Sequence, residues 1–238
     1  MFTNVKYYDI CEHSMKKPAK IIQPPSFGGT VALMNTFERL WMTALLINNR
    51  GGALTFREFS SISGLSLGFI SKFADLLRKR GFLKQGQRLQ VVEASQLLNI
   101  IRDIYFFEGN TVIPYYSNDS TEVLMKKIKI ADKKHAYALT RMSGASLIAP
   151  YVRYKFVDFY VKNPEEFPYW KDYLKLVDVE VSGNMNIIIP QDQRILAQTQ
   201  MIKGWSVVNN VQLYLDLYKY PARGREQAEY LREQVLKI

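Results

Sequence analysis

Basic side chains are concentrated in one part of the sequence, between residues 50 and 92. This stretch contains eight lysines or arginines but only two acidic residues, Glu58 and Asp75, so its net charge is +6. A cluster of cations with few counter-charges is typical of a surface that binds phosphates of nucleic acids, although short basic runs also occur as plain solvated faces. The basic residues are Arg50, Arg57, Lys72, Arg78, Lys79, Arg80, Lys84 and Arg88.

The elements predicted within this basic region decide between the two interpretations. Thr55 is expected to cap a short helix, with Glu58 three residues later completing a capping box, and Gly64 ends that helix. Ser66 is expected to cap a second helix, whose apolar residues continue through Leu77. Two short helices joined by a tight glycine-containing turn form a helix-turn-helix.

Flanking elements extend this unit to a winged helix-turn-helix. Upstream, apolar residues at steps of three and four predict a helix that begins near Met34 and ends at Gly51-Gly52. Downstream, the Gln85-Gly86 turn between apolar residues predicts two short strands, which would form the wing. Domains of this kind bind DNA in many proteins, and some bind only proteins, so a winged-helix protein-interaction module is an alternative.

Candidate DNA contacts follow from the way a helix-turn-helix docks on DNA. Its second helix enters the major groove, led by its N-terminal residues. Hydroxyl, amino and guanidinium groups bind phosphates or base edges there, a glycine allows close approach, and the wing tip can reach the minor groove. The predicted contacts are Arg57, Ser66, Gly68, Phe69, Ser71, Lys72, Arg78, Lys79, Arg80, Gln87 and Arg88. For Phe69, an exposed contact and a core position are equally compatible with the spacing.

The rest of the chain predicts three segments. Residues 1–30 form an N-terminal arm, because Pro24-Pro25 and Gly28-Gly29 interrupt any long element. Residues 31–108 form the winged helix-turn-helix domain with a connecting helix, and residues 109–238 alternate between strand and helix patterns. The expected fold class is therefore α+β, with an N-terminal winged helix-turn-helix domain followed by a mixed α+β C-terminal domain.

Catalytic motifs are absent from the second half of the sequence. It contains no P-loop, no GxSxG and no HExxH motif, and one cysteine and two histidines in the chain give no metal-ligand set. No catalytic residue, cofactor or metal is therefore predicted. One enzymatic alternative is a metal-dependent nuclease or nucleotide-modifying enzyme that uses Asp178 and Glu180 on one strand with Lys171 or Lys175 nearby.

Asp216 is an isolated acidic residue in an otherwise apolar helix, among Leu213, Leu215 and Leu217. A charge at such a position needs a partner. Arginines that follow closely in the sequence predict a structural ion pair with one of Arg223, Arg225 or Arg232.

Composition bounds the class and location of the protein. The 238 residues are 47% hydrophobic and carry a formal net charge of +10, which is typical of a globular protein with a polyanionic partner. The single cysteine indicates a reducing compartment. No window approaches the roughly 18 apolar residues of a spanning helix, and the N-terminus lacks the order of a signal peptide, so a soluble cytoplasmic protein without a membrane partner is expected.

Several sequence blocks, taken in order with the winged-helix pattern, resemble the AbiEi family. The blocks are Tyr137–Thr140, Ala145–Tyr151, Val207-Val208, the QLYLDL run Gln212–Leu217 and the GREQAE run Gly224–Glu229. AbiEi proteins are antitoxins and transcriptional regulators of prokaryotic type IV abortive-infection toxin–antitoxin systems. The resemblance extends over the chain from about Met34 and does not cover the N-terminal arm.

The resemblance implies two tasks. The N-terminal domain would bind inverted repeats of double-stranded DNA in its own promoter and repress it, as a monomer or as a dimer on the DNA. The C-terminal domain would counteract a nucleotidyltransferase-like toxin without forming a stable complex with it. The implied protein is a repressor and antitoxin, not an enzyme, and needs no cofactor.

Overall fold

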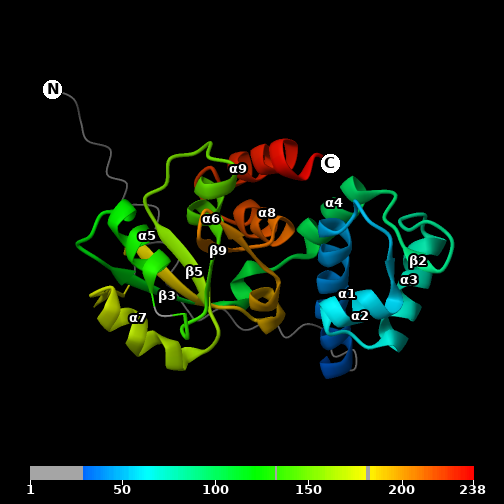
Figure 1. The fold of residues 1–238 in the computed structure, drawn as a ribbon, viewed down its shortest axis with the longest axis horizontal. Helices are drawn as coiled ribbons and strands as arrows, with labels where there is room; N and C mark the ends of the chain where they lie inside the picture. The colour runs from blue at the N-terminus through cyan, green and yellow to red at the C-terminus, as the bar shows by residue number, and fades with distance from the viewer. Residues whose placement is uncertain (1–28, 132, 181–182) are drawn as a thin grey trace, which may run out of the picture. The chain divides into compact units, whose positions relative to one another are not determined.

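The computed structural model describes residues 29–131, 133–180 and 183–238 (Figure 1). The predicted arm, residues 1–30, lies almost entirely outside the described residues. Contacts divide the chain into the units Met1–Thr36 and Phe37–Ile238, and the features below belong to the second unit apart from the start of the first helix. This division does not test the boundary expected at residues 108 and 109, which stays a prediction.

The first half of the structure contains four helices and a two-stranded sheet. Helix α1 (Gly29–Asn48) begins five residues before its predicted start at Met34, so the expectation that Gly28-Gly29 interrupts the chain was wrong at Gly29. A glycine weakens the interior of a helix but costs less at its first position, where no intrahelical N–H bond is lost. Further along are β1 (Leu54–Thr55), α2 (Phe56–Ser63), α3 (Leu67–Lys79), β2 (Arg88–Leu89) and α4 (Ala94–Ile104).

Local side-chain bonds set the ends of α2 and α3 as predicted. Thr55 N donates to Glu58 Oε2 at 2.7 Å and Glu58 N donates to Thr55 Oγ1 at 3.2 Å, which completes the capping box. Gly64 ends α2 in the left-handed region at φ 69°, and its N–H donates to the carbonyl of Ser60. Ser66 Oγ then accepts from the N–H of Phe69 at 3.3 Å and caps α3.

Alanine substitutions at two glycines near this turn are expected to change the stability in opposite directions. A Cβ at Gly64 or at Gly68 would meet no atom within 4 Å, so steric space does not distinguish them. Gly64→Ala is expected to lower the free energy of unfolding by about 1 kcal/mol, because alanine is strained at positive φ. Gly68→Ala is expected to raise it by up to about 1 kcal/mol, because alanine favours the helix. Urea denaturation of both variants checks this, and equal effects would contradict it.

The predicted pair of strands around Gln85-Gly86 is present as a short hairpin. Leu83 and Val91 form an antiparallel bridge, and Lys84 N donates to the carbonyl of Gln90 at 2.9 Å. The sequence did not predict β1, whose residues Leu54 and Thr55 pair antiparallel with Leu89 and Arg88 of β2. This pairing joins the hairpin to the start of α2.

The second half is built on a mixed seven-stranded sheet in the order β6-β3-β7-β5-β4-β9-β8. Strand β5 runs parallel to β7 and β4 runs parallel to β9, whereas the other neighbours are antiparallel. The expected α+β class is thereby confirmed. The strands are β3 (Thr111–Tyr116), β4 (Tyr137–Leu139), β5 (Val157–Val161), β6 (Val177–Asp178), β7 (Met185–Ile189), β8 (Thr199–Ile202) and β9 (Trp205–Val208).

Helices cover both faces of this sheet, as the alternating side chains of β5 indicate. Phe159 points to one face, where its ring lies 4.9 Å from that of Trp170 in α7. Tyr160 points to the other face, where its hydroxyl donates to Asp216 of α8. All residues of β5 are therefore buried. The helices are α5 (Thr121–Ile130), α6 (Arg141–Ile148), α7 (Phe167–Tyr173), α8 (Asn210–Tyr218) and α9 (Gly224–Leu231).

Short helical turns connect these elements. They are η1 (Phe107–Gly109), η2 (Pro164–Glu166), η3 (Gln193–Gln198) and the π-helical turn η4 (Arg232–Leu236) that continues α9. Over the described part of the chain, every helix is too short or too polar to cross a membrane.

Candidate nucleic-acid interface

Helix α3 presents a stripe of four exposed residues to solvent. Gly68, Lys72, Asp75 and Lys79 follow one another at steps of four, three and four, so they lie on one face of the helix, and all four are exposed. Lys72 and Lys79 form no ion pair with any acidic side chain in the described ranges. The stripe therefore carries two free ammonium groups, and we refer to these four residues as the α3 stripe.

The N-terminal end of α3 is open and polar. Ser66 is exposed and accepts one backbone hydrogen bond, which leaves its hydroxyl hydrogen free to donate. Gly68 has open space where a Cβ would be. The first N–H groups of a helix have no partner within it, so an anion such as a phosphate can approach here.

Two of the predicted contacts in the first half of α3 are half-buried. Phe69 packs against the core, with its ring centroid 5.9 Å from that of Phe73. The sequence was equally compatible with a core position and an exposed DNA contact for Phe69, and this packing supports the core position. Ser71 is also half-buried, which leaves Ser66 and Lys72 as the accessible polar residues in the first half of the helix.

Arg78 was predicted to contact DNA, which requires an exposed guanidinium, but this side chain is largely buried. Its side chain is only 10% exposed, its Nη1 lies 3.0 Å from Asp75 Oδ1, and its Nη2 donates to the carbonyl of Arg88 at 3.4 Å. Its guanidinium also lies 5.4 Å from the centroid of the Phe56 ring. Arg78 therefore connects α2, α3 and the hairpin, and its assignment as a backbone contact is corrected to a structural role.

The remaining predicted contacts are exposed, and one of them does not lie at the wing tip. Arg57, Lys79, Arg80 and Gln87 are exposed as expected. Arg88 is exposed too, but it belongs to β2, and its Nη1 donates to the carbonyl of Ala53 at 3.0 Å. The prediction that Arg88 stands at the tip was wrong because the strand begins at this residue.

Lys84 is a basic residue that was not among the predicted DNA contacts. It is exposed on the first strand of the hairpin, where only its backbone is bonded to Gln90. Its charge had been counted in the basic region, and the alternation along the hairpin, with Leu83 buried beside it, is the signal that predicts its exposure.

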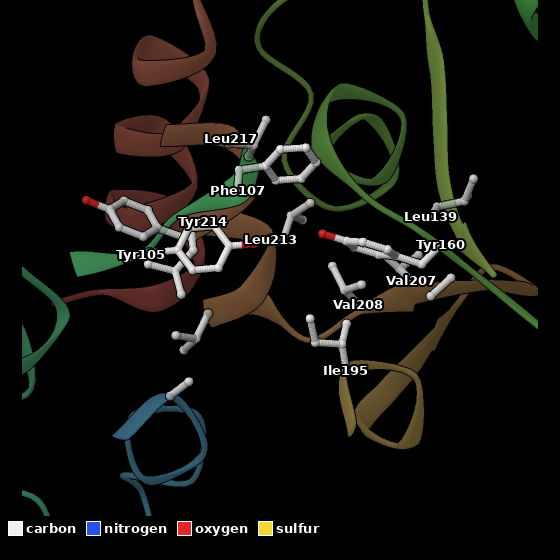
Figure 2. Close-up of a cluster of buried hydrophobic side chains, with 14 of the residues drawn as sticks. Tyr105, Phe107, Leu139, Tyr160, Ile195, Val207, Val208, Leu213, Tyr214 and Leu217 are labelled. Carbon is white, nitrogen blue, oxygen red and sulfur yellow. The ribbon is translucent and has the colours of Figure 1, made fainter. Parts of the chain in front are cut away.

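The expected ion pair of Asp216 is replaced by a buried network of neutral donors. Asp216 is fully buried and accepts hydrogen bonds from Tyr105 at 2.5 Å, from Gln212 at 2.8 Å, from Tyr160 at 3.1 Å and from the Thr140 hydroxyl. Burial raises the pKa of Asp216 above its usual range, and these hydrogen bonds oppose that rise. Figure 2 shows Tyr105 and Tyr160 in the surrounding cluster of buried side chains.

The arginines near Asp216 in sequence pair with other groups. Arg223 Nη2 lies 2.7 Å from Glu226 Oε2, and Arg232 Nη1 lies 3.7 Å from Glu229 Oε2. These partners are three residues away on α9 or its continuation. The predicted ion pair of Asp216 with one of these arginines was therefore wrong, because α8 turns this carboxylate into the core and not toward α9.

A second buried charge lies close by and was also missed from the sequence. Arg141, at φ 48°, places Nη1 3.6 Å from Oδ1 of the fully buried Asp158, and Asn186 donates to that same oxygen at 2.7 Å. The Arg141 guanidinium lies 3.7 Å from the Phe107 ring centroid. Burial raises the pKa of Asp158, and Arg141 opposes this rise. Asp158 is fully buried and Arg141 is only 8% exposed, so we assign this pair to the core.

The residues of the enzymatic alternative form a surface pair. Lys171 Nζ lies 2.5 Å from Asp178 Oδ2, with the two side chains 42% and 74% exposed. Glu180 is exposed beyond β6. Within residues 29–131, 133–180 and 183–238, no three His, Cys, Asp or Glu side chains lie close enough together to hold a metal ion.

Comparisons of the chain with protein-family models, with curated proteins and with solved structures found no match.

Proposed function

We propose that the protein is a sequence-specific, double-stranded-DNA-binding transcriptional regulator, in which α2, α3 and the hairpin act as a winged helix-turn-helix. The observation that carries this proposal is the α3 stripe, because it exposes two unpaired lysines on the helix that follows a tight turn at Gly64. In a helix-turn-helix, the corresponding helix lies in the major groove.

Charge around the stripe supports the same proposal. Six basic residues between positions 50 and 92 are exposed, namely Arg57, Lys72, Lys79, Arg80, Lys84 and Arg88. Exposed acidic side chains are few there, and Asp75 is already paired with Arg78. Such a surface attracts DNA phosphates, and Ser66 with Lys72 supplies groups that can read base edges.

The AbiEi resemblance extends this proposal to an autorepressing antitoxin that counteracts a nucleotidyltransferase-like toxin. Its C-terminal blocks form α8 and α9, and Gln212 and Asp216 of the QLYLDL block are buried in the polar network. These residues stabilise the fold, so the block gives no contact surface for a toxin. DNA binding is therefore the task that the described residues support best.

DNA binding is tested by titrating the purified full chain with its own upstream DNA and with a scrambled duplex over a salt series. If all six exposed cations contact phosphates, log K is expected to fall with log salt at a slope of about −5. The upstream DNA should stay bound at salt concentrations that release the scrambled duplex. Equal affinity for both duplexes at every salt concentration would contradict a sequence-specific regulator.

A further inference from the structure

A small cavity of about 190 Å³ lies against α3, on a different face of the helix from the α3 stripe. Phe73, Leu76, Leu77 and Arg80 line it from α3 and its end, and their spacing of three, one and three residues places them on one face of that helix. Its other walls are formed by residues of α1, including the polar Thr43, by Phe82 and by apolar side chains of α4. The cavity is thus bounded by the helix that we propose enters DNA.

The volume and lining of the cavity limit what it can hold. An apolar cavity of about 150 Å³ accommodates one benzene ring, whereas pockets for drug-sized ligands measure roughly 300–1,000 Å³. The present cavity is therefore large enough for a single ring or a short aliphatic chain and too small for a nucleotide. Its lining is mainly Leu, Ile and Phe, which favours an apolar body over a polar one.

Two arginines give the cavity a charged border. Arg39 and Arg80 both line it and both are exposed, and neither forms an ion pair with an acidic residue in the part of the chain that the structure describes. The Arg39 guanidinium lies 5.8 Å from the ring centroid of Phe73, which is itself part of the wall. A guanidinium binds a carboxylate through two parallel hydrogen bonds. The two unpaired arginines are therefore complementary to a ligand that carries one carboxylate.

We propose that this cavity binds a small amphipathic carboxylate, with its apolar body between α1, α3 and α4 and its carboxylate on Arg39 and Arg80. We further infer that the bound carboxylate weakens DNA binding, because it occupies Arg80, one of the six exposed cations of the DNA-binding surface. The inference that the ligand binds depends only on the cavity and the residues that line it. The inference that it weakens DNA binding also rests on the proposed function.

Binding is measured first without DNA, by isothermal titration of the full chain with phenylacetate at constant ionic strength. Phenylacetate is expected to bind one site per chain. Phenylacetamide, which has nearly the same shape but no charge, is expected to bind at least about 10-fold more weakly, and acetate is expected to show no saturable binding. Absence of saturable phenylacetate binding, or equal affinity for the amide, would overturn the proposal.

Two variants locate the site. Arg39→Gln is expected to weaken phenylacetate binding by about 10-fold, whereas Arg153→Gln, at an exposed arginine outside the cavity, is expected to leave it unchanged. Ile104→Trp enlarges a side chain on the cavity wall that is 53% exposed, and it should reduce binding more than Ile130→Trp at a position that is 76% exposed elsewhere. Unchanged binding in both Arg39→Gln and Ile104→Trp would place the ligand outside this cavity.

The effect on DNA is then measured with phenylacetate at saturation, using acetate to match ionic strength. The salt slope for the upstream DNA is expected to become shallower by about 0.9, the value for one phosphate contact, and the affinity should fall. Saturable phenylacetate binding with unchanged DNA affinity would overturn the regulatory step and leave the site intact. A protein that binds phenylacetate but no DNA would instead contradict the proposed function.

Discussion

Lys72→Glu is expected to weaken binding to the protein's own upstream DNA by roughly 10- to 100-fold, because one charged contact in a DNA interface is worth about 1–3 kcal/mol. Lys72 is exposed in the middle of the α3 stripe and has no acidic partner within the described residues, so the lysine is free for a phosphate or base. The reversed charge adds repulsion from the DNA. Fluorescence anisotropy with labelled upstream DNA measures the change, and the salt slope should fall by about 1.

Lys155→Glu provides the matched control, because it changes the net charge by the same amount at an exposed residue far along the sequence from α3. It is expected to alter affinity by less than about 3-fold, because an exposed charge that makes no contact with the DNA acts only through a field that salt screens. If both variants weaken binding equally, only the overall charge of the protein matters. If Lys72→Glu leaves the affinity unchanged, the winged-helix protein-interaction module becomes the better hypothesis.

Features set by neighbouring residues in the sequence were predicted well. The capping box of Thr55 and Glu58, the left-handed end at Gly64 and the Ser66 cap all depend on bonds within five residues, and each is present. The turn at Gln85-Gly86 is local in the same way, because Gly86 adopts φ 128°. The helices and turns of residues 34–92 could therefore be deduced from local sequence, whereas β1 could not, because it forms only by pairing with Arg88 and Leu89 more than 30 residues later.

Features that depend on distant partners were missed or misassigned. The alternating residues Val152–Val161 indicate a strand in the sequence, but β5 begins only at Val157, where it starts to pair with Met185 of β7. Arg78 was expected to be free, yet its neighbours come from α2 and from the hairpin ten residues later. Basic residues are chemically alike in the sequence, and only the fold determines which of them is used for packing and which faces solvent.

Polar residues inside the second half show the same limit. The partners of Asp216 include Tyr105, which lies 111 residues earlier, and Tyr160, which lies 56 residues earlier. The sequence indicated that this carboxylate needs partners, and the arginines close to it in sequence were the evident choice. Three hydroxyls and an amide satisfy it instead, because α8 packs on the sheet with Asp216 facing β5 and the end of α4.

The substitution with the largest expected effect on stability removes Asp216 from this network. Asp216→Ala is expected to lower the free energy of unfolding by roughly 3–5 kcal/mol, because each buried donor left without an acceptor costs about 1–3 kcal/mol. Asp216 is fully buried, and its four donors come from α8, from β5, and from the residues at the end of α4 and the start of α6. For a chain of this length, the midpoint of thermal unfolding should fall by about 6–20 °C.

Three further variants separate the hydrogen bonds from the charge. Asp178→Ala removes an exposed carboxylate, 74% accessible, and should change the free energy of unfolding by no more than about 0.5 kcal/mol. Asp216→Asn keeps the shape but presents an NH₂ group to donors, so it should also destabilise substantially. Tyr105→Phe removes one donor while Gln212 still satisfies that oxygen, and it should cost only about 1 kcal/mol. If urea denaturation finds Asp216→Ala no more harmful than Asp178→Ala, desolvation of the carboxylate offsets its four hydrogen bonds.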